Sequence, residues 1–134
     1  MGEYMSEETT LNHVALQCLD KEKAEIFFTK VLGLKRVKNF VLSKELSKAI
    51  FGIDDNVKID VYENNRMRFE IFIGNNCKKH GYEHTCIEVK NKKEFISCCK
   101  SYEIEPIIVK KKEKELLFVK DFSDNLYEIK ERAT

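Results

Sequence analysis

Two histidines and two glutamates stand at repeated places in the sequence, and side chains of these types can bind a metal ion. His13 opens the segment His-Val-Ala-Leu-Gln, and His84 opens the similar segment His-Thr-Cys-Ile-Glu 71 positions later. Glu70 lies in Phe-Glu-Ile, and Glu128 lies in Tyr-Glu-Ile 58 positions later. Imidazole suits Zn, Ni, Co and Fe, and carboxylates complete the charge balance. An isolated His or Glu on a strand is usually a surface group, so it is the repetition that favours one shared metal site.

A metal ion held by these four side chains would keep one or two coordination positions open for water or substrate. Such an ion acts as a Lewis acid that polarises a carbonyl and stabilises an enediolate. A ligand carboxylate or a metal-bound hydroxide can then move a proton. The chemistry predicted from the residue types is therefore metal-assisted proton transfer on a small oxygenated molecule.

The predicted strands and helices that carry the four candidate ligands occur in the same order in each half of the sequence. The first unit has predicted strands at 11–18, 34–41, 57–63 and 67–73, a helix that begins after Asp20 and ends at Gly33, and a short helix at 43–53. The second unit has predicted strands at 82–89, 106–111, 115–121 and 125–131, and a helix after Asn91 that runs from about 92 to 102. Both are βαβββ units, and the caps Asp20 and Asn91 keep the offset of 71. The smaller offset of 58 fits the short helix, because only the first unit has it.

The alternation of side chains along the strands places each candidate ligand on one face. Successive residues of a strand point to opposite sides. His13 therefore shares a face with Ala15 and Gln17, while Val14 and Leu16 point the other way. His84, Glu70 and Glu128 also lie opposite the more apolar face of their strands. We expect the apolar faces to pack under the two helices and the other faces to line a polar concavity.

Several segments resemble the vicinal-oxygen-chelate superfamily, also called the glyoxalase/bleomycin-resistance/dioxygenase fold. The matching segments are residues 11–16, 28–34, 69–72, 82–89 and 118–129, of which the last is the most specific. The resemblance implies an α+β fold in which two βαβββ modules form a cupped mixed sheet with the helices on the outside. It also implies that the metal ligands are His13, Glu70, His84 and Glu128.

The resemblance further implies a metal-dependent lyase or isomerase of the glyoxalase I (lactoylglutathione lyase) type. In that reaction a proton is transferred through a metal-bound enediolate, and the metal would be Ni, Zn or Co. Glu70 and Glu128 are the candidate catalytic residues that shuttle the proton. Two positions depart from glyoxalase I, because Gln17 replaces an Arg that holds glutathione and Gly74 replaces an Asn. The substrate, and whether it contains glutathione, therefore stay open.

Two other functions remain possible on the same residues. One is a metal-independent small-molecule-binding or drug-sequestering protein of the bleomycin-resistance type. The other is an isomerase similar to methylmalonyl-CoA epimerase, in which the equivalent of Glu70 is usually Gln. Members with a single domain usually dimerise, so we expect a homodimer. The sequence leaves open whether His13 and Glu70 join His84 and Glu128 of their own chain or of a partner.

The composition is that of one ordinary domain. The chain has 134 residues, with a predicted flexible N-terminus at 1–10 and a single domain at 11–134, divided into modules at about 11–74 and 82–131. Lys and Arg number 24 against 23 Asp and Glu, so no nucleic acid or anionic membrane is expected as a partner. No apolar run approaches the roughly 20 residues that cross a bilayer. The odd count of 5 cysteines and the acidic start predict a cytoplasmic protein with reduced thiols.

Overall fold

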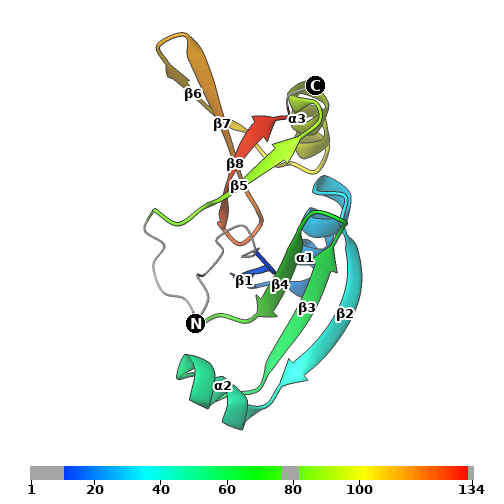
Figure 1. The fold of residues 1–134 in the computed structure, drawn as a ribbon, viewed down its shortest axis with the longest axis vertical. Helices are drawn as coiled ribbons and strands as arrows, with labels where there is room; N and C mark the ends of the chain where they lie inside the picture. The colour runs from blue at the N-terminus through cyan, green and yellow to red at the C-terminus, as the bar shows by residue number, and fades with distance from the viewer. Residues whose placement is uncertain (1–10, 77–81, 133–134) are drawn as a thin grey trace, which may run out of the picture.

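The predicted order of elements is confirmed in the structure. The computed structural model describes residues 11–76 and 82–132, and the predicted flexible N-terminus at 1–10 lies outside them (Figure 1). The elements are β1 (Val14–Cys18), α1 (Lys21–Glu25), η2 (Ile26–Val31), β2 (Lys35–Leu42), α2 (Lys44–Phe51), β3 (Val57–Glu63), β4 (Arg68–Ile73), β5 (Thr85–Val89), α3 (Lys92–Ser101), β6 (Ile107–Lys111), β7 (Lys114–Lys120) and β8 (Leu126–Glu131). They form two βαβββ modules, of which only the first contains the additional helix α2.

Each module contributes one four-stranded mixed sheet. The strand orders are β1-β4-β3-β2 and β5-β8-β7-β6, in which the pairs β1–β4 and β5–β8 are parallel and the other pairs are antiparallel. Ala15 pairs with Glu70 in the first sheet, and Cys86 pairs with Glu128 in the second. Ala15 and Cys86 are 71 positions apart, and Glu70 and Glu128 are 58 positions apart, which are the offsets of the sequence repeat. The internal repeat is therefore confirmed at the level of strand register.

Short polar side chains start the helices as predicted. The side chain of Asp20 accepts a hydrogen bond from the backbone amide of Lys23 at the start of α1. The side chain of Asn91 accepts one from the backbone amide of Glu94 at the start of α3. Such a bond satisfies one of the amide groups that have no partner in the first turn of a helix. The first helix ends before Gly33, whose φ of 73° lies in the left-handed region that glycine adopts without strain.

One helix differs from its predicted form, because α1 continues into the π-helical segment η2. The amide of Leu32 donates to the carbonyl of Phe27, five residues back, instead of four. The adjacent residues Phe27 and Phe28 are both fully buried in this segment. In the wider π-helical turn, successive side chains lie closer together around the helix axis than in an α-helix. Two adjacent aromatic rings can therefore both be buried.

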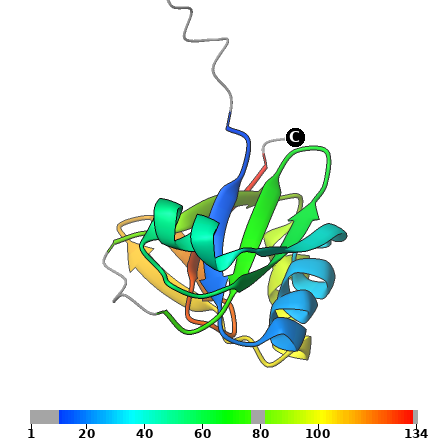
Figure 2. The same cartoon turned by 90° about the horizontal axis from the view of Figure 1, so that it is seen from below.

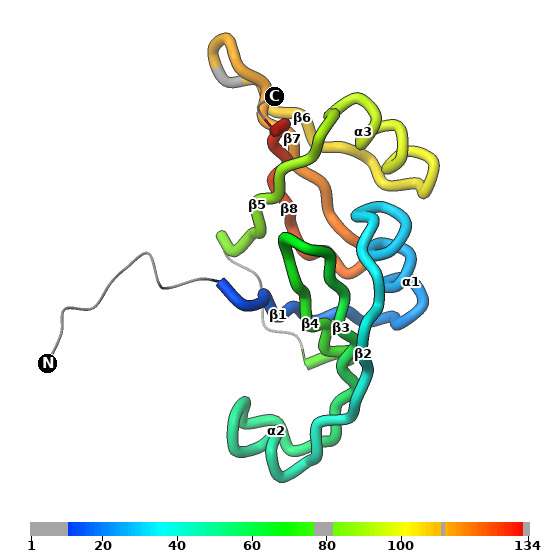
Figure 3. Tube along the Cα trace, turned by 45° about the vertical axis from the view of Figure 1, so that its right-hand side comes forward, coloured from blue at the N-terminus to red at the C-terminus, as the bar shows by residue number. Residues whose placement is uncertain are grey.

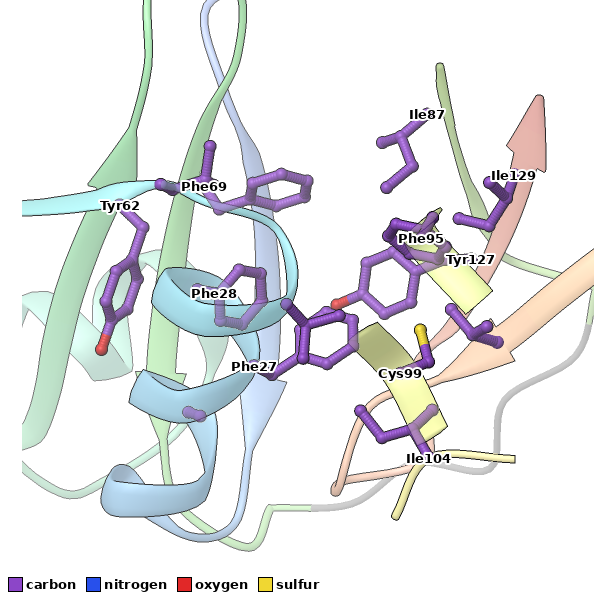
Figure 4. Packing of buried hydrophobic residues seen from close by; sticks show 14 of the residues in the cluster. Phe27, Phe28, Tyr62, Phe69, Ile87, Phe95, Cys99, Ile104, Tyr127 and Ile129 are labelled. Carbon is purple, nitrogen blue, oxygen red and sulfur yellow. The ribbon is translucent and has the colours of Figure 1, made fainter. Parts of the chain in front are cut away.

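The aromatic rings of η2 join both modules into one hydrophobic core (Figure 4). Phe28 stacks on Tyr62 of the first module with ring centroids 5.3 Å apart. Phe27 reaches Tyr127 of the second module at 4.9 Å. Phe69 and Tyr127, the neighbours of the two candidate glutamates, are buried on this side. The predicted direction of the apolar strand faces, toward the helices, is thus confirmed.

The helices α1 and α3 lie on the same side of the two sheets, whereas α2 lies elsewhere (Figures 1 and 3). Seen from below, α1 and α2 flank the strands of the first sheet from opposite sides (Figure 2). The face that carries the candidate ligands is therefore free of α1 and α3, and in the first module α2 borders it.

A buried polar cluster connects the modules at the start of β8. The side chain of Asn125 donates to the backbone carbonyl of Gln17 at 2.9 Å and to the carboxylate of Asp121 at 2.9 Å. Asp121 also accepts a hydrogen bond from the hydroxyl of Tyr127 at 2.8 Å. Ser123 accepts one from the amide of Leu19 in the first module. The bonds from Asn125 to Gln17 and from Leu19 to Ser123 position one module against the other.

Candidate metal centre

The second module brings His84 and Glu128 together. His84 immediately precedes β5, Glu128 lies in β8, and His84 Nε2 is 3.3 Å from Glu128 Oε1. The other ring nitrogen, Nδ1, lies 3.0 Å from the backbone carbonyl oxygen of Tyr82. A carbonyl accepts hydrogen bonds only, so Nδ1 is the donor to Tyr82. In the neutral tautomer with this proton, the lone pair is on Nε2, which faces the Glu128 carboxylate. That tautomer, oriented by a backbone carbonyl, is the one in which histidine binds metals through Nε2.

The first module brings His13 and Glu70 together in the same way, with one difference. His13 Nδ1 lies 3.6 Å from Glu70 Oε2, and it also lies 2.8 Å from the side-chain oxygen of Asn12. Both pairs are partly exposed, so water or a small molecule can reach them. In each module the candidate His thus lies near the candidate Glu of the same module.

The spacing within each pair fits two ligands of one metal ion. Two donor atoms about 2.1 Å from an ion, at an angle between 90° and 109°, lie about 3.0 to 3.4 Å apart. The distance of 3.3 Å between His84 and Glu128 falls in this range, and the 3.6 Å between His13 and Glu70 lies just above it. The Asn12 oxygen only accepts hydrogen bonds, so His13 Nδ1 has to give up this contact before it can bind a metal. One nitrogen and one oxygen donor from each pair would then form a set that divalent transition metals accept.

The two pairs do not form one group within a single chain. Among residues 11–76 and 82–132, no three His, Cys, Asp or Glu side chains lie close enough together to hold a metal ion. Each module thus supplies half of the predicted set of four. The complete set of His13, Glu70, His84 and Glu128 stays a prediction.

Cys86 lies beside the second pair as the register partner of Glu128. The thiol is exposed, and its pKa is raised by the surrounding protein and then by the negative charge of Glu128. A raised pKa keeps the thiol protonated near neutral pH, and the protonated thiol is a poor metal ligand. The corresponding residue of the first module, Ala15, has no polar side chain.

A cavity of about 590 Å³ opens next to the first pair. Its walls are Ala15, Leu16, Gln17, Ser47, Phe51, Gly52, Ile53, Val57, Phe72, Gly74, Asn76 and Glu83. Ala15 is the register partner of Glu70, and Phe72 follows Glu70 on the same face of β4, about 7 Å further along the strand. The part that α2 plays in this cavity was not predicted. The sequence signal for α2 is the difference between the repeat offsets of 71 and 58 positions, because the additional residues belong to the first module alone.

Solved structures with this architecture were found by comparison. A glyoxalase family protein from Bacillus cereus matches with a TM-score of 0.75 and 15% identity, over 98% of this chain and 100% of that chain. The fosfomycin resistance protein FosX from Listeria monocytogenes matches with a TM-score of 0.70 and 14% identity, over 93% and 94% of the two chains. The chain has the vicinal-oxygen-chelate fold. A variant of the same FosX, complexed with Mn(II) and 1S,2S-dihydroxypropylphosphonic acid, has a TM-score of 0.70 and 15% identity over 91% of both chains.

The vicinal-oxygen-chelate fold confirms the predicted fold class of two βαβββ modules. No protein-family model and no curated protein matches the sequence, so the likeness is one of structure. FosX proteins with this fold have been solved with Mn(II) bound. None of the helices in residues 11–76 and 82–132 has the length and apolar character needed to span a membrane.

In this vicinal-oxygen-chelate fold, the two positions that depart from glyoxalase I both lie at the cavity. The side-chain oxygen of Gln17 accepts a hydrogen bond from the amide of Asn76 at 2.8 Å. Gly74 lines the same cavity. At both positions the cavity offers a neutral group in place of the residues that the resemblance to glyoxalase I led us to expect.

Proposed function

We propose that the protein is a metal-dependent lyase or isomerase that transfers a proton on a small oxygenated substrate. The observation that carries this proposal is the pairing of His with Glu in both modules, at ligand spacing for His84–Glu128 (3.3 Å) and slightly wider for His13–Glu70 (3.6 Å). All four side chains would hold one divalent ion, for which Ni, Zn and Co are candidates and to which the FosX complexes add Mn. A glyoxalase I-type reaction is one member of this class.

We infer that the site is completed by two copies of the chain. Each copy presents two separate half-sites, so the first pair of one copy would join the second pair of its partner. Exposed apolar side chains support such an association, because Ile107, Ile108 and Val109 on β6 lie open to solvent in the single chain. The homodimer expected from the sequence would then be part of the active site.

The carboxylates are the groups that would move the proton. When bound, the metal would supply Lewis-acid polarisation of a substrate oxygen. Glu70 and Glu128 each place one carboxylate oxygen beside a histidine, which leaves the second oxygen to accept a proton from a substrate carbon and return it to the neighbouring carbon. His84 is held in its orientation by the Tyr82 carbonyl, so the second pair is prearranged before a ligand arrives.

Metal content after mixing two variants tests this proposal. His13→Ala and His84→Ala chains should each lose metal, measured by elemental analysis after incubation with Ni, Co, Zn or Mn. When both are unfolded together and refolded, about a quarter of the wild-type metal content should return, because half of randomly formed dimers are mixed and each has one intact site. Glu88→Gln is the control on β5, and it should leave the metal content unchanged.

Two outcomes of the mixing experiment would contradict parts of the proposal. Wild-type protein that takes up less than about one-tenth of a metal ion per chain would exclude the metal-dependent function. Loss of metal in both single variants with no recovery on mixing would place all four ligands in one chain.

The cavity favours a second candidate, a metal-independent binding or drug-sequestering protein. A volume of about 590 Å³ is within the range of sites that bind drug-sized ligands. Binding of a small molecule that survives both Glu128→Gln and chelation of metals would support this alternative over the enzyme.

A further inference from the structure

We propose that the His84–Glu128 pair captures the metal ion first, and that Phe118 is a positioning residue that orients His84 for this step. The inference rests on the proposed function, in which His84 and Glu128 are metal ligands. It adds an order of binding to that function, because the His13–Glu70 pair of a second copy would join an ion that the second module already holds.

Three contacts fix the imidazole ring of His84. Nδ1 lies 3.0 Å from the carbonyl oxygen of Tyr82, and Nε2 lies 3.3 Å from Glu128 Oε1. The ring of Phe118 meets the imidazole in a T-shaped arrangement, with ring centroids 6.3 Å apart and planes 70° apart. Such ring pairs are favourable, whereas the last torsion of a histidine side chain is by itself only weakly restricted. The contact with Phe118 therefore restrains the ring plane, and Nε2 points to the carboxylate before an ion arrives.

Phe118 and Glu128 lie on the two inner strands of the second sheet, β7 and β8. They are register partners, so their side chains are neighbours on the same face of the sheet. His84 instead precedes β5, which lies at the end of the strand order. The orientation of its ring thus depends on side chains that the inner strands hold in place.

The two facing atoms of the second pair would be stabilised by a cation between them. In the neutral tautomer that donates to Tyr82, the lone pair of His84 Nε2 faces the carboxylate of Glu128. Both atoms are then acceptors, and neither can donate a hydrogen bond to the other. A divalent ion bound to both would replace this contact with two attractive ones, in competition with protons.

The first pair has a different environment. Val61 is the register partner of Glu70, so a branched aliphatic side chain occupies the place that Phe118 has in the second module. The nitrogen of His13 that faces Glu70 also lies 2.8 Å from the side-chain oxygen of Asn12. Giving up this contact costs free energy that the second pair does not have to spend. The second pair should therefore bind an ion more tightly when each pair is measured alone.

Titration with Co(II) at pH 8, followed by visible absorption, compares the two pairs at equilibrium. The double variant His13→Ala/Glu70→Gln keeps only the second pair, and His84→Ala/Glu128→Gln keeps only the first. The chain with the second pair should bind Co(II) with a dissociation constant about ten-fold lower than that of the chain with the first pair. Equal dissociation constants, or tighter binding by the first pair, would overturn the order of binding.

Three further substitutions in the chain that keeps the second pair test the role of Phe118. Phe118→Leu should raise the dissociation constant for Co(II) about ten-fold, the effect expected of a residue that orients a metal ligand. Phe118→Tyr keeps the ring and should restore tight binding. Leu116→Ala is the control, because Leu116 is half-buried like Phe118 and lies two residues before it on the same face of β7. No effect of Phe118→Leu, no rescue by Phe118→Tyr, or an equal effect of Leu116→Ala would overturn the positioning role.

The orientation of His84 is also measurable without metal, because nitrogen-15 NMR distinguishes a proton on Nδ1 from one on Nε2. Wild-type protein should show His84 with the proton on Nδ1, and Phe118→Leu should show a mixture of tautomers with an unchanged circular dichroism spectrum. The same tautomer in both proteins, or a mixture in the wild type, would overturn the positioning role.

These readouts separate failure of this inference from failure of the proposed function. Wild-type protein that binds no Co(II) would refute the metal-dependent function together with the order of binding, while the tautomer of His84 would still decide the role of Phe118. Wild-type protein that binds Co(II), with two pairs of equal affinity, would refute the order of binding alone.

Discussion

Replacing Tyr127 with Phe removes a single hydroxyl from the contact between the two modules. This hydroxyl donates a hydrogen bond to Asp121 at 2.8 Å, and both residues are buried. A hydrogen bond to a charged group contributes about 1.5 to 3 kcal/mol to stability. We therefore expect Tyr127→Phe to lower the free energy of unfolding by about 2 kcal/mol, which is about 8 °C in Tm for a domain of this size.

Tyr62 provides a matched control in the first module. It packs on Phe28 much as Tyr127 packs on Phe27, and it is fully buried. Its hydroxyl, however, has no hydrogen-bond partner among the described residues. Burying a hydroxyl without a partner costs about 1 to 3 kcal/mol. Tyr62→Phe should therefore leave the stability unchanged or raise it by about 1 kcal/mol.

Urea unfolding followed by far-ultraviolet circular dichroism at pH 7 measures both changes by linear extrapolation. A change of less than about 0.5 kcal/mol in the free energy of unfolding of Tyr127→Phe would show that the hydroxyl does not stabilise the fold. Equal losses of stability in the two variants would show that the hydrogen bond to Asp121 is not the cause. Equal denaturant slopes for all three proteins are needed for the comparison.

Two further predictions concern alkaline stability and a helix cap. Burial, followed by the negative charge of Asp121, raises the pKa of Cys18 from 9.0 to about 12. The native state then keeps a proton that the unfolded chain releases, so the free energy of unfolding should fall as the pH rises from about 9 to 12. Cys18→Ala should make this fall with pH less steep by up to about 1.4 kcal/mol per pH unit, measured by urea titrations. Asp20→Ala should lower the free energy of unfolding by about 1 kcal/mol, because the amide of Lys23 loses its acceptor, while Asp20→Asn should restore most of it in the same assay.

The elements and their duplication were predictable because local interactions determine them. Asp20 and Asn91 each bond an amide three residues ahead, and the strands carry alternating side chains that the sequence displays directly. The offset between His13 and His84 was enough to predict equivalent places in the two modules, which the strand registers confirm. Each of these features depends on neighbours within a few positions of the chain.

Other features depend on contacts between distant segments, and only the tertiary structure decided them. The π-helical turn at Phe27 and Phe28 results from rings that must meet both modules, and α2 forms a cavity wall because β3 and β4 lie opposite it. The four candidate ligands share a strand face in the sequence, but the structure separates them into two pairs. A repeat predicts equivalent places, whereas the distance between those places is determined by how two sheets pack and by which copy of the chain each sheet meets.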